Sequence, residues 1–208
     1  MALAVEALMA KQVRRIVLTR PAVEAGERER VVSWLPLYHD MGLVGGGLPA
    51  FVGGFSAWLR RPFDFLAEPS LWPRSIGDLG ATMSPSPNFG YAYCARSAKD
   101  ERMQGVDLSS WRVAFCGAEP IRSATVRRFC HRFGPHGFRA ETFLPCYGLA
   151  EATLAVTFAA HSARPRYLVM DPRSCLLYTS PSTRDQRGSG IPGCALKKKT
   201  GGGGGGGG

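Results

Sequence analysis

The chain has 208 residues, of which 45% are hydrophobic and 10% aromatic, a composition that can bury a core and excludes a wholly disordered protein. Its formal net charge is +10, from 26 Lys and Arg against 16 Asp and Glu. Residues 174–208 hold a share of this excess, with five basic residues, one acid and the run Gly201–Gly208. The other basic residues are scattered among acids and form no nucleic-acid-binding motif, so we expect no nucleic-acid partner.

The six cysteines occur singly, and no set of Cys and His has the spacing of a zinc site. The nearest approach is Cys130-His131 with His136, for which free, partly buried thiols are the better interpretation. The amino terminus has no positively charged region before an apolar stretch and is a poor signal peptide. These features favour a reducing compartment, and we expect a cytoplasmic protein.

One uncharged stretch, residues 41–59, approaches the length of a membrane span. It contains six glycines and Pro49, which disfavour a continuous helix. The stretch therefore predicts a buried helix followed by a strand, and no transmembrane segment.

In chain order, the first half of the sequence predicts short elements separated by glycine and proline. An amphipathic helix over 2–16 is followed by a charged connection, and Asn88 is a candidate N-cap of a later helix. The expected elements up to residue 97 are a strand at 31–35, a loop at 37–42, a helix starting at 41–47, a strand at 56–59, helices within 64–79 broken at Pro69 and Pro73, a strand at 81–84 and a helix at 88–97.

A strand–helix–strand unit follows. It consists of a strand at 111–115, a tight turn at 117–120, a helix at 123–133 with Ser123 as candidate N-cap, and a strand at 142–144. Strands that alternate with helices through short connections are typical of α/β proteins. We therefore predict an α/β fold with a parallel or mixed sheet flanked by helices.

Three of the predicted loops directly follow strands, namely residues 37–42, 117–120 and 147–151. Ligands of such sheets bind outside the carboxyl ends of the strands, so we expect these loops to face one crevice. Each loop alone also has a structural interpretation. His39 could be satisfied by hydrogen bonds in a capped loop, 117–120 could be a plain turn, and Glu151 could be an acid favoured at a helix start.

Taken together, four motifs carry a resemblance to a known family. They are WLPLYHDMGL at 34–43, SPNFGYAYC at 86–94, LSSWRVAFCGAEPIR at 108–122 and FLPCYGLAEATL at 143–154. In order and spacing they resemble the adenylate-forming superfamily, and their wording is most similar to the fatty-acyl-AMP ligase branch. The resemblance covers about residues 31–173 and implies part of the N-terminal, AMP-binding domain of a longer enzyme. Residues 1–30 match poorly.

The resemblance implies an enzyme that activates a fatty acid with ATP, giving acyl-adenylate and pyrophosphate. The acyl group would then pass to the thiol of an acyl carrier protein, a polyketide or peptide synthase module, or CoA. It also implies bound Mg²⁺. The alternative that we retain is a non-catalytic, adenylation-like module that binds nucleotide or acyl chains.

The resemblance also assigns residues. His39 and Glu151 match catalytic positions, with His39 where the acyl and phosphate sites join and Glu151 as the magnesium ligand. Tyr147 and Gly148 match the segment beside the adenine. The segment that lines the other face of the base matches Gly117, Ala118 and Glu119. Met83, Phe89 and Tyr93 are candidates for lining the acyl tunnel, although core packing explains each nearly as well.

The sequence departs from the family pattern in several places. Cys116 stands where these ligases usually have asparagine, and no glycine-rich phosphate loop precedes the first motif. Residues 177–188 resemble that loop but follow the Glu151 motif, and Pro181 replaces a glycine whose N–H the loop needs. We therefore predict that 174–208 is a non-native or disordered tail, and that the 208-residue chain by itself is inactive.

Overall fold

The computed structural model describes residues 29–159, 164, 165 and 167. The chain divides into two units, Met1–Arg166 and Tyr167–Gly208, and all of the described helices and strands belong to the first. The helix predicted over 2–16 and the tail predicted over 174–208 lie outside the described residues.

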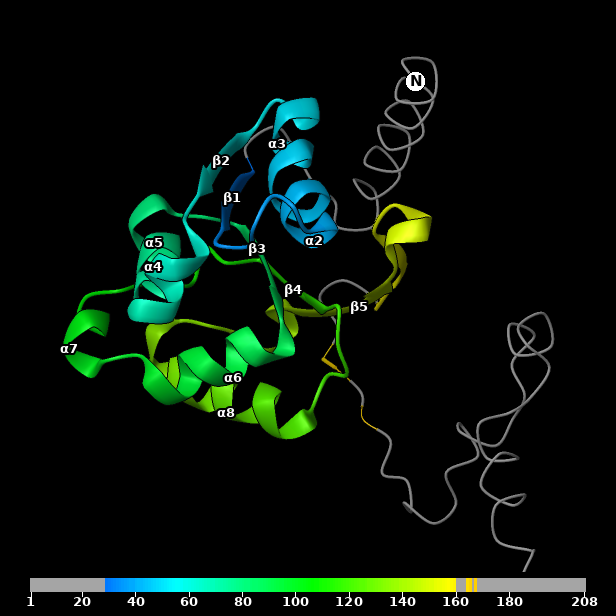
Figure 1. The fold of residues 1–208 in the computed structure, drawn as a ribbon. Coiled ribbons are helices and arrows are strands. Elements are labelled where there is room, and N and C mark those ends of the chain that lie inside the picture. Colours follow the sequence, from blue (N-terminus) through cyan, green and yellow to red (C-terminus); the bar gives the residue numbers. More distant parts are fainter. Residues whose placement is uncertain (1–28, 160–163, 166, 168–208) are drawn as a thin grey trace, which may run out of the picture. The chain divides into compact units, whose positions relative to one another are not determined.

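The described part of the chain is built around one six-stranded sheet (Figure 1). The first five strands of the chain are parallel to one another, and the sixth pairs antiparallel with the fifth. In spatial order the strands are β2 (Ser56–Leu59), β1 (Arg30–Ser33), β3 (Met83–Pro87), β4 (Val113–Gly117), β5 (Phe143–Gly148) and β6 (Ala155–Phe158). The α/β fold with a mixed, mostly parallel sheet flanked by helices is therefore confirmed.

Helices cover both faces of this sheet because the direction of winding reverses after β2. Right-handed crossovers place the connection from β1 to β2 on one face and the connections from β2 through β5 on the other. Figure 1 shows α2 and α3 on one side and α5, α6 and α8 on the opposite side. The first group is α2 (Asp40–Gly42), the π-helix η1 (Leu43–Gly47) and α3 (Leu48–Gly53); the second is α4 (Pro62–Ala67), α5 (Leu71–Leu79), α6 (Asn88–Ser97), α7 (Asp100–Met103) and α8 (Ser123–Phe133).

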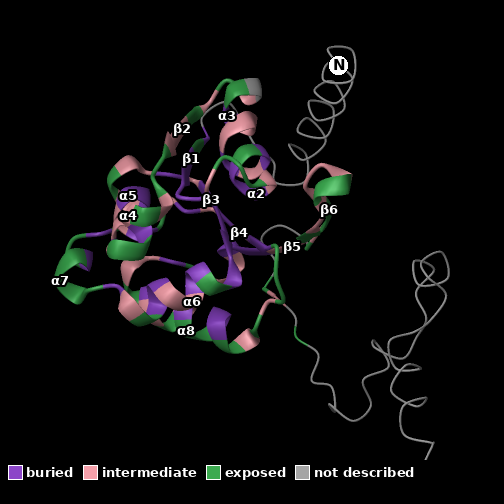
Figure 2. Ribbon diagram, viewed as in Figure 1, coloured by how far each residue is buried: buried purple, intermediate pink, exposed green. Residues whose placement is uncertain are grey.

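The main core is aromatic and lies between the sheet and the second group of helices, where Figure 2 shows the buried residues gathered. Trp72 of α5 is at its centre and is 1% exposed. Its ring meets those of Tyr91, Trp111 and Phe129 at centroid distances of 5.1, 5.4 and 6.1 Å. The indole N–H donates to Ser84 Oγ at 2.8 Å, so the polar end of this buried side chain is satisfied.

The opposite face of the sheet holds a smaller apolar cluster. It consists of one buried residue from each of four neighbouring strands, Val31, Met83, Val113 and Leu144. Val32 and Ala114, the next residues along β1 and β4, belong to the main core. This alternation is the period of two that a strand imposes when both of its faces are covered.

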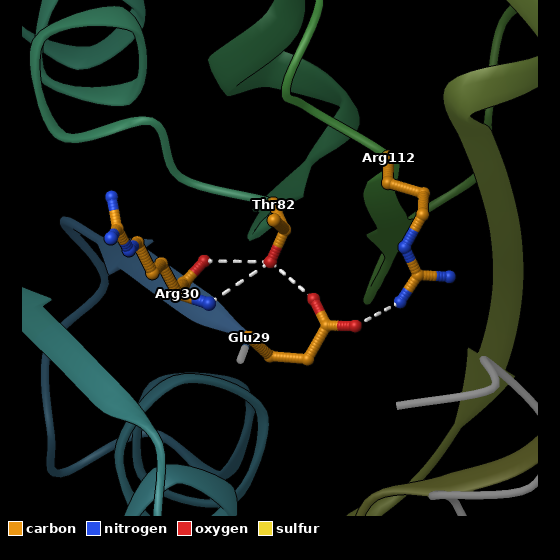
Figure 3. Close-up of polar contacts among 4 residues, drawn as sticks. All are labelled: Glu29, Arg30, Thr82 and Arg112. Carbon is orange, nitrogen blue, oxygen red and sulfur yellow. Dashed lines mark hydrogen bonds and ion pairs between the residues drawn. The ribbon is translucent and has the colours of Figure 1, made fainter. Parts of the chain in front are cut away.

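A polar cluster ties together the amino-terminal ends of three strands (Figure 3). The buried Glu29 carboxylate pairs with Arg112 and accepts a hydrogen bond from the Thr82 hydroxyl. Thr82 Oγ1 accepts from the Arg30 backbone N–H at 3.0 Å. A buried carboxylate is costly unless it is paired, so these contacts stabilise the start of β1 against the starts of β3 and β4.

Two predicted N-caps and one predicted helix break are wrong, although the helices predicted at 88–97 and 123–133 have their expected bounds. Pro73 does not break a helix, because it lies in the first turn of α5, where its missing N–H has no partner to lose. The N-cap of α6 is Pro87 and not Asn88, and that of α8 is Arg122 and not Ser123. The predicted break at Pro69 is confirmed, because α4 ends before it and α5 begins after it.

The strands also differ from expectation. β3 continues through Pro85 and Pro87, although proline has no N–H to donate. The strand tolerates them because beyond Met83 it pairs only with β4. β4 begins two residues later than predicted, and Trp111 lies before it, with its indole N–H bonded to Val113 O at 2.9 Å. The antiparallel strand β6 was not predicted.

No helix in the part of the chain that the structure describes is long and apolar enough to cross a membrane. The uncharged stretch 41–59 forms helical turns up to Gly53 and then β2, as the sequence indicates.

Candidate functional site

The topology brings the candidate site residues to one edge of the sheet. Because β1, β3, β4 and β5 are parallel, the segments that follow them leave from the same, carboxyl-terminal edge. The winding direction reverses between β1 and β3, which is the switch point at which such sheets bind ligands. His39 follows β1, Ala118 follows β4 and Glu151 follows β5.

His39 is the N-cap of α2. The Met41 backbone N–H donates to His39 Nδ1 at 3.1 Å and to Asp40 Oδ1 at 2.7 Å, and these two acceptors lie 2.8 Å apart. These contacts fix the ring on its Nδ1 side, and half of the side chain stays exposed. His39 therefore has the structural role, that of a helix cap, which the sequence allowed. Its other ring nitrogen, Nε2, makes no hydrogen bond within residues 29–159.

The turn after β4 has a backbone conformation that the sequence did not reveal. Ala118 has a φ of 65°, in the left-handed region that L-residues rarely adopt. Gly117 is needed for packing, because a Cβ there would lie 2.7 Å from Cys146 O. Such strain in a well-packed turn is frequent at functional sites. Ala118 and Glu119 are exposed, and Gly117 is buried.

Two hydrogen bonds join this turn to the start of α6. Glu119 Oε1 accepts from the Phe89 backbone N–H at 2.5 Å, and Asn88 Oδ1 accepts from the Arg122 N–H at 3.1 Å. The segments that follow β3 and β4 are thus held together at the carboxyl edge. Sequence reasoning missed these bonds, although Asn88 and Glu119 are residue types that satisfy free N–H groups at helix starts.

Tyr147, Gly148 and Glu151 lie where β5 turns back into β6. Tyr147 is 60% exposed at the end of β5. A Cβ on Gly148 would lie 1.7 Å from Leu154 O, so this hairpin requires glycine. Glu151 is exposed in the 3-10 helix η4 (Ala150–Ala152), and its carboxylate has no ion pair or hydrogen bond with any described residue.

This carboxylate fits the expected metal. Mg²⁺ keeps several waters and takes one or two protein carboxylates together with substrate phosphates. Within residues 29–159, no group of three or more His, Cys, Asp and Glu side chains could hold a metal by itself. A single free carboxylate such as Glu151 is what a metal shared with a nucleotide needs.

Apolar groups are exposed at the same edge. Tyr38, after β1, is 93% exposed, and Phe89, after β3, is 48% exposed. Behind Phe89 the indole of Trp34 is buried, 5.9 Å from the Phe89 ring, and its N–H has no partner in the described part of the chain. Exposed aromatic rings beside a few polar groups are typical of small-molecule sites. Met83 lies in the smaller core cluster, and Tyr93 packs against the main one.

Two thiols lie below the turn. Burial raises the pKa of Cys116, with smaller contributions from Cys146 and Glu119, and burial raises the pKa of Cys146 to about 11. Cys146 Sγ contacts Cys116 O at 3.4 Å. Neither sulfur is therefore an activated nucleophile, since the thiolate is the reactive form.

We expect slow alkylation of two thiols as a consequence. Burial also raises the pKa of Cys130 to about 11. At pH 8 only about one in a thousand such groups is ionised, against about one in four for an ordinary thiol. Peptide mapping after iodoacetamide treatment should show Cys130 and Cys146 reacting at least about a hundredfold more slowly than a short cysteine peptide whose thiol has the ordinary pKa, with rates that rise toward pH 11. Equal rates at pH 8 would contradict these pKa shifts.

A comparison with known protein families matches residues 5–183 to the family described as AMP-binding enzyme. This match extends beyond the interval 31–173 in which the four motifs lie. The division of the chain into 1–30, 31–173 and 174–208 stays a prediction.

Curated relatives point to fatty-acid ligases. The chain is 42% identical over 139 residues to a medium-chain-fatty-acid–[acyl-carrier-protein] ligase of Teredinibacter turnerae, covering 67% of this chain and 22% of that protein. It is 37% identical over 174 residues to a long-chain-fatty-acid–AMP ligase of Mycolicibacterium smegmatis, covering 81% of this chain and 26% of that protein. The chain thus spans about a quarter of the length of these relatives.

Solved structures agree. A fatty acyl-adenylate ligase from Legionella pneumophila, solved with acyl adenylate and pyrophosphate, superposes with a TM-score of 0.72 at 42% identity. The match covers 74% of this chain and 27% of that one. The adenylation domain of a keto acid-selecting peptide synthetase module, bound to keto acyl adenylate, gives a TM-score of 0.67 at 27% identity and covers 72% and 28%.

Proposed function

Because the chain belongs to the AMP-binding enzyme family, in its fatty-acyl-AMP ligase branch, we propose that it forms part of a longer enzyme that adenylates fatty acids. The reaction joins a fatty acid to the α-phosphate of ATP and releases pyrophosphate. The acyl group then passes to a thiol, which in our proposal belongs to a carrier protein, as the name of the T. turnerae relative suggests. CoA is the other candidate acceptor.

The observation that carries this proposal is the free carboxylate of Glu151 at the edge that also holds His39 and the Gly117–Glu119 turn. A fatty-acid carboxylate and a triphosphate are both anions, so their reaction needs positive charge and oriented donors between them. In the proposed site, Glu151 would hold Mg²⁺ together with the phosphates of the nucleotide. Bound Mg²⁺ would neutralise phosphate charge as the leaving pyrophosphate forms.

The other residues position the two substrates in this proposal. Gly117 and Ala118 carry little or no side chain, so a flat base can approach their backbone, with Tyr147 and Gly148 on its other side. Glu119 holds the turn by its bond to Phe89 N–H. His39, whose Nδ1 accepts from the Met41 backbone N–H, would direct its Nε2 toward the reacting carboxylate. Apolar side chains such as Phe89 line the path of the acyl chain.

Pyrophosphate exchange in the full-length enzyme tests this function. We expect incorporation of labelled pyrophosphate into ATP that requires both a fatty acid and Mg²⁺. Tight binding of ATP or fatty acid without exchange would instead support the alternative, a non-catalytic binding module. Exchange that proceeds with amino acids and not with fatty acids would contradict the proposed substrate class.

The 208-residue chain by itself is expected to show no exchange above background. We identify no phosphate loop of the family in its sequence. Groups that offset the charge of the triphosphate are central to phosphoryl-group chemistry, and such a loop would supply some of them. The check is the same exchange assay with a long-chain fatty acid, run beside the full-length enzyme at equal concentration. Turnover of the short chain well above the no-enzyme background would show this expectation wrong.

A further inference from the structure

The outer face of α8 and the residue before it carry a stripe of basic side chains. Helix α8 buries one face through Thr125, Val126, Phe129 and Phe133. The exposed positions on its other side include Arg127, Arg128 and His131, and Arg122 is exposed immediately before it. We call these four residues, Arg122, Arg127, Arg128 and His131, the α8 stripe. The helix contains no acidic residue.

The stripe is unusual because most other Lys and Arg side chains in the described part of the chain contact a carboxylate, another hydrogen-bond acceptor or an aromatic ring. Lysine and arginine form six ion pairs in the described part of the chain: Arg61–Asp64, Arg74–Asp78, Lys99–Glu68, Arg112–Glu29, Arg132–Asp100 and Arg164–Glu141. Arg30 and Arg60 donate to Leu79 O and Ser75 Oγ, Arg96 lies over the Tyr93 ring, and Arg139 contributes to lowering the pKa of Glu141. Among residues 29–159, four arginine side chains remain without such a partner, and three of them belong to the stripe: Arg102, Arg122, Arg127 and Arg128.

The position of the stripe links it to the site. Gly117 ends β4 at the carboxyl edge, and Arg122 follows it by five residues. Helix α8 then runs away from this edge, and His131 lies about 12 Å along the helix from Ser123 at 1.5 Å per residue. The bond from the Arg122 N–H to Asn88 Oδ1 holds the beginning of the stripe at the site edge.

We propose that the α8 stripe docks the acidic face of the carrier protein that accepts the acyl group. This inference rests on the proposed function. A thiol on a flexible arm must reach the carboxyl edge, and a docking surface that begins at that edge places its carrier within reach. Complementary charge gives such a contact its orientation and its on-rate.

The observations favour a carrier protein over a nucleic acid. Nucleic-acid binding draws on many phosphate contacts spread over a basic surface. Most other cations of the described residues are instead neutralised by neighbouring carboxylates or engaged by other groups, so the stripe is short and local. A stripe of four side chains suits one helix of a small acidic domain.

Binding measurements test the proposal with the 208-residue chain. The probe is a purified, strongly acidic bacterial acyl carrier protein with a fluorescent label, followed by anisotropy. Arg127→Glu/Arg128→Glu should weaken binding at least about tenfold, and raising NaCl from about 50 to about 300 mM should weaken binding of the parent chain. Arg102→Glu, which changes another unpaired and exposed arginine off the stripe, should alter affinity less than about twofold. Thermal unfolding checks that all three chains are equally folded.

Three results would overturn the proposal. They are equal affinity of the parent and the double variant, no binding of the parent at about 1 mM carrier, or stripe-dependent binding of a DNA duplex or phosphatidylglycerol vesicles that is tighter than carrier binding. Pyrophosphate exchange by the full-length enzyme, measured without carrier, tests the proposed function independently of carrier docking. The double variant should leave that exchange unchanged, and absence of exchange in the parent would remove the proposed function alone.

Discussion

Replacing Trp72 by alanine is expected to destabilise the folded chain by about 3–5 kcal/mol, the largest stability effect that we predict. Trp72 is 1% exposed and contacts the rings of Trp34, Phe65, Tyr91, Trp111 and Phe129. No neighbouring side chain can fill the space of an indole, so a cavity remains. Because domains of this size are stable by only about 5–15 kcal/mol, urea unfolding followed by circular dichroism should show a large loss.

Ser84→Ala is the matched control for this prediction. Ser84 Oγ accepts from the Trp72 indole and donates to Val32 O at 2.5 Å, so its removal leaves two buried polar groups unpaired but no large cavity. We expect a smaller loss, about 1–3 kcal/mol. If Trp72→Ala cost no more than Ser84→Ala, aromatic packing would not be the main source of stability in this core.

Replacing Glu151 by glutamine is expected to lower pyrophosphate exchange on the order of 100-fold in the full-length enzyme, the largest effect on activity that we predict. Glutamine keeps the size of the side chain and removes its negative charge. Glu151 is exposed and has no partner among the described residues, so the change should leave stability nearly unaltered. The assay is exchange at several Mg²⁺ concentrations, and the dependence on Mg²⁺ should shift to higher concentration.

Glu101→Gln is the control, because Glu101 is also an exposed glutamate but lies on α7, in the segment that leads into β4 at the amino-terminal edge. It should leave exchange and its Mg²⁺ dependence unchanged. An unaltered Mg²⁺ dependence in Glu151→Gln would remove Glu151 as the metal ligand, even if the rate fell.

The strand pattern was the most predictable part of this fold. Apolar runs such as Val31–Val32 and Val113–Ala114 are typical of buried parallel strands, and they lie where strands were expected. The helix over Ser123–Phe133 was predicted with its observed bounds, since Thr125, Val126, Phe129 and Phe133 have the spacing of one helix face.

Boundaries that depend on long-range contacts were not predictable. The sequence favours Asn88 as an N-cap, but its side chain bonds to Arg122 N–H, 34 residues away. Pro85 and Pro87 indicate a loop by local rules. They are tolerated in β3 because beyond Met83 this strand pairs on one side only, with β4. Strand β6 follows a hairpin built on Gly148 and on Thr153, whose φ is 79°.

For the candidate site, the order of strands and loops allowed the sequence to predict which segments follow parallel strands. The left-handed Ala118 had no local signal, because alanine rarely marks such a turn, and the bond partner of Glu119 is Phe89, 30 residues away. The roles assigned to His39, Tyr147 and Glu151 stay predictions.

Photolabelling of the full-length enzyme with an azido derivative of ATP tests the central claim most directly, namely that the carboxyl edge of this sheet binds the nucleotide. We predict that excess ATP protects against labelling, and that labelled peptides contain Gly117–Glu119 or Tyr147. Labelling confined to peptides of the amino-terminal edge, such as those with Thr82 or Arg112, would contradict the account.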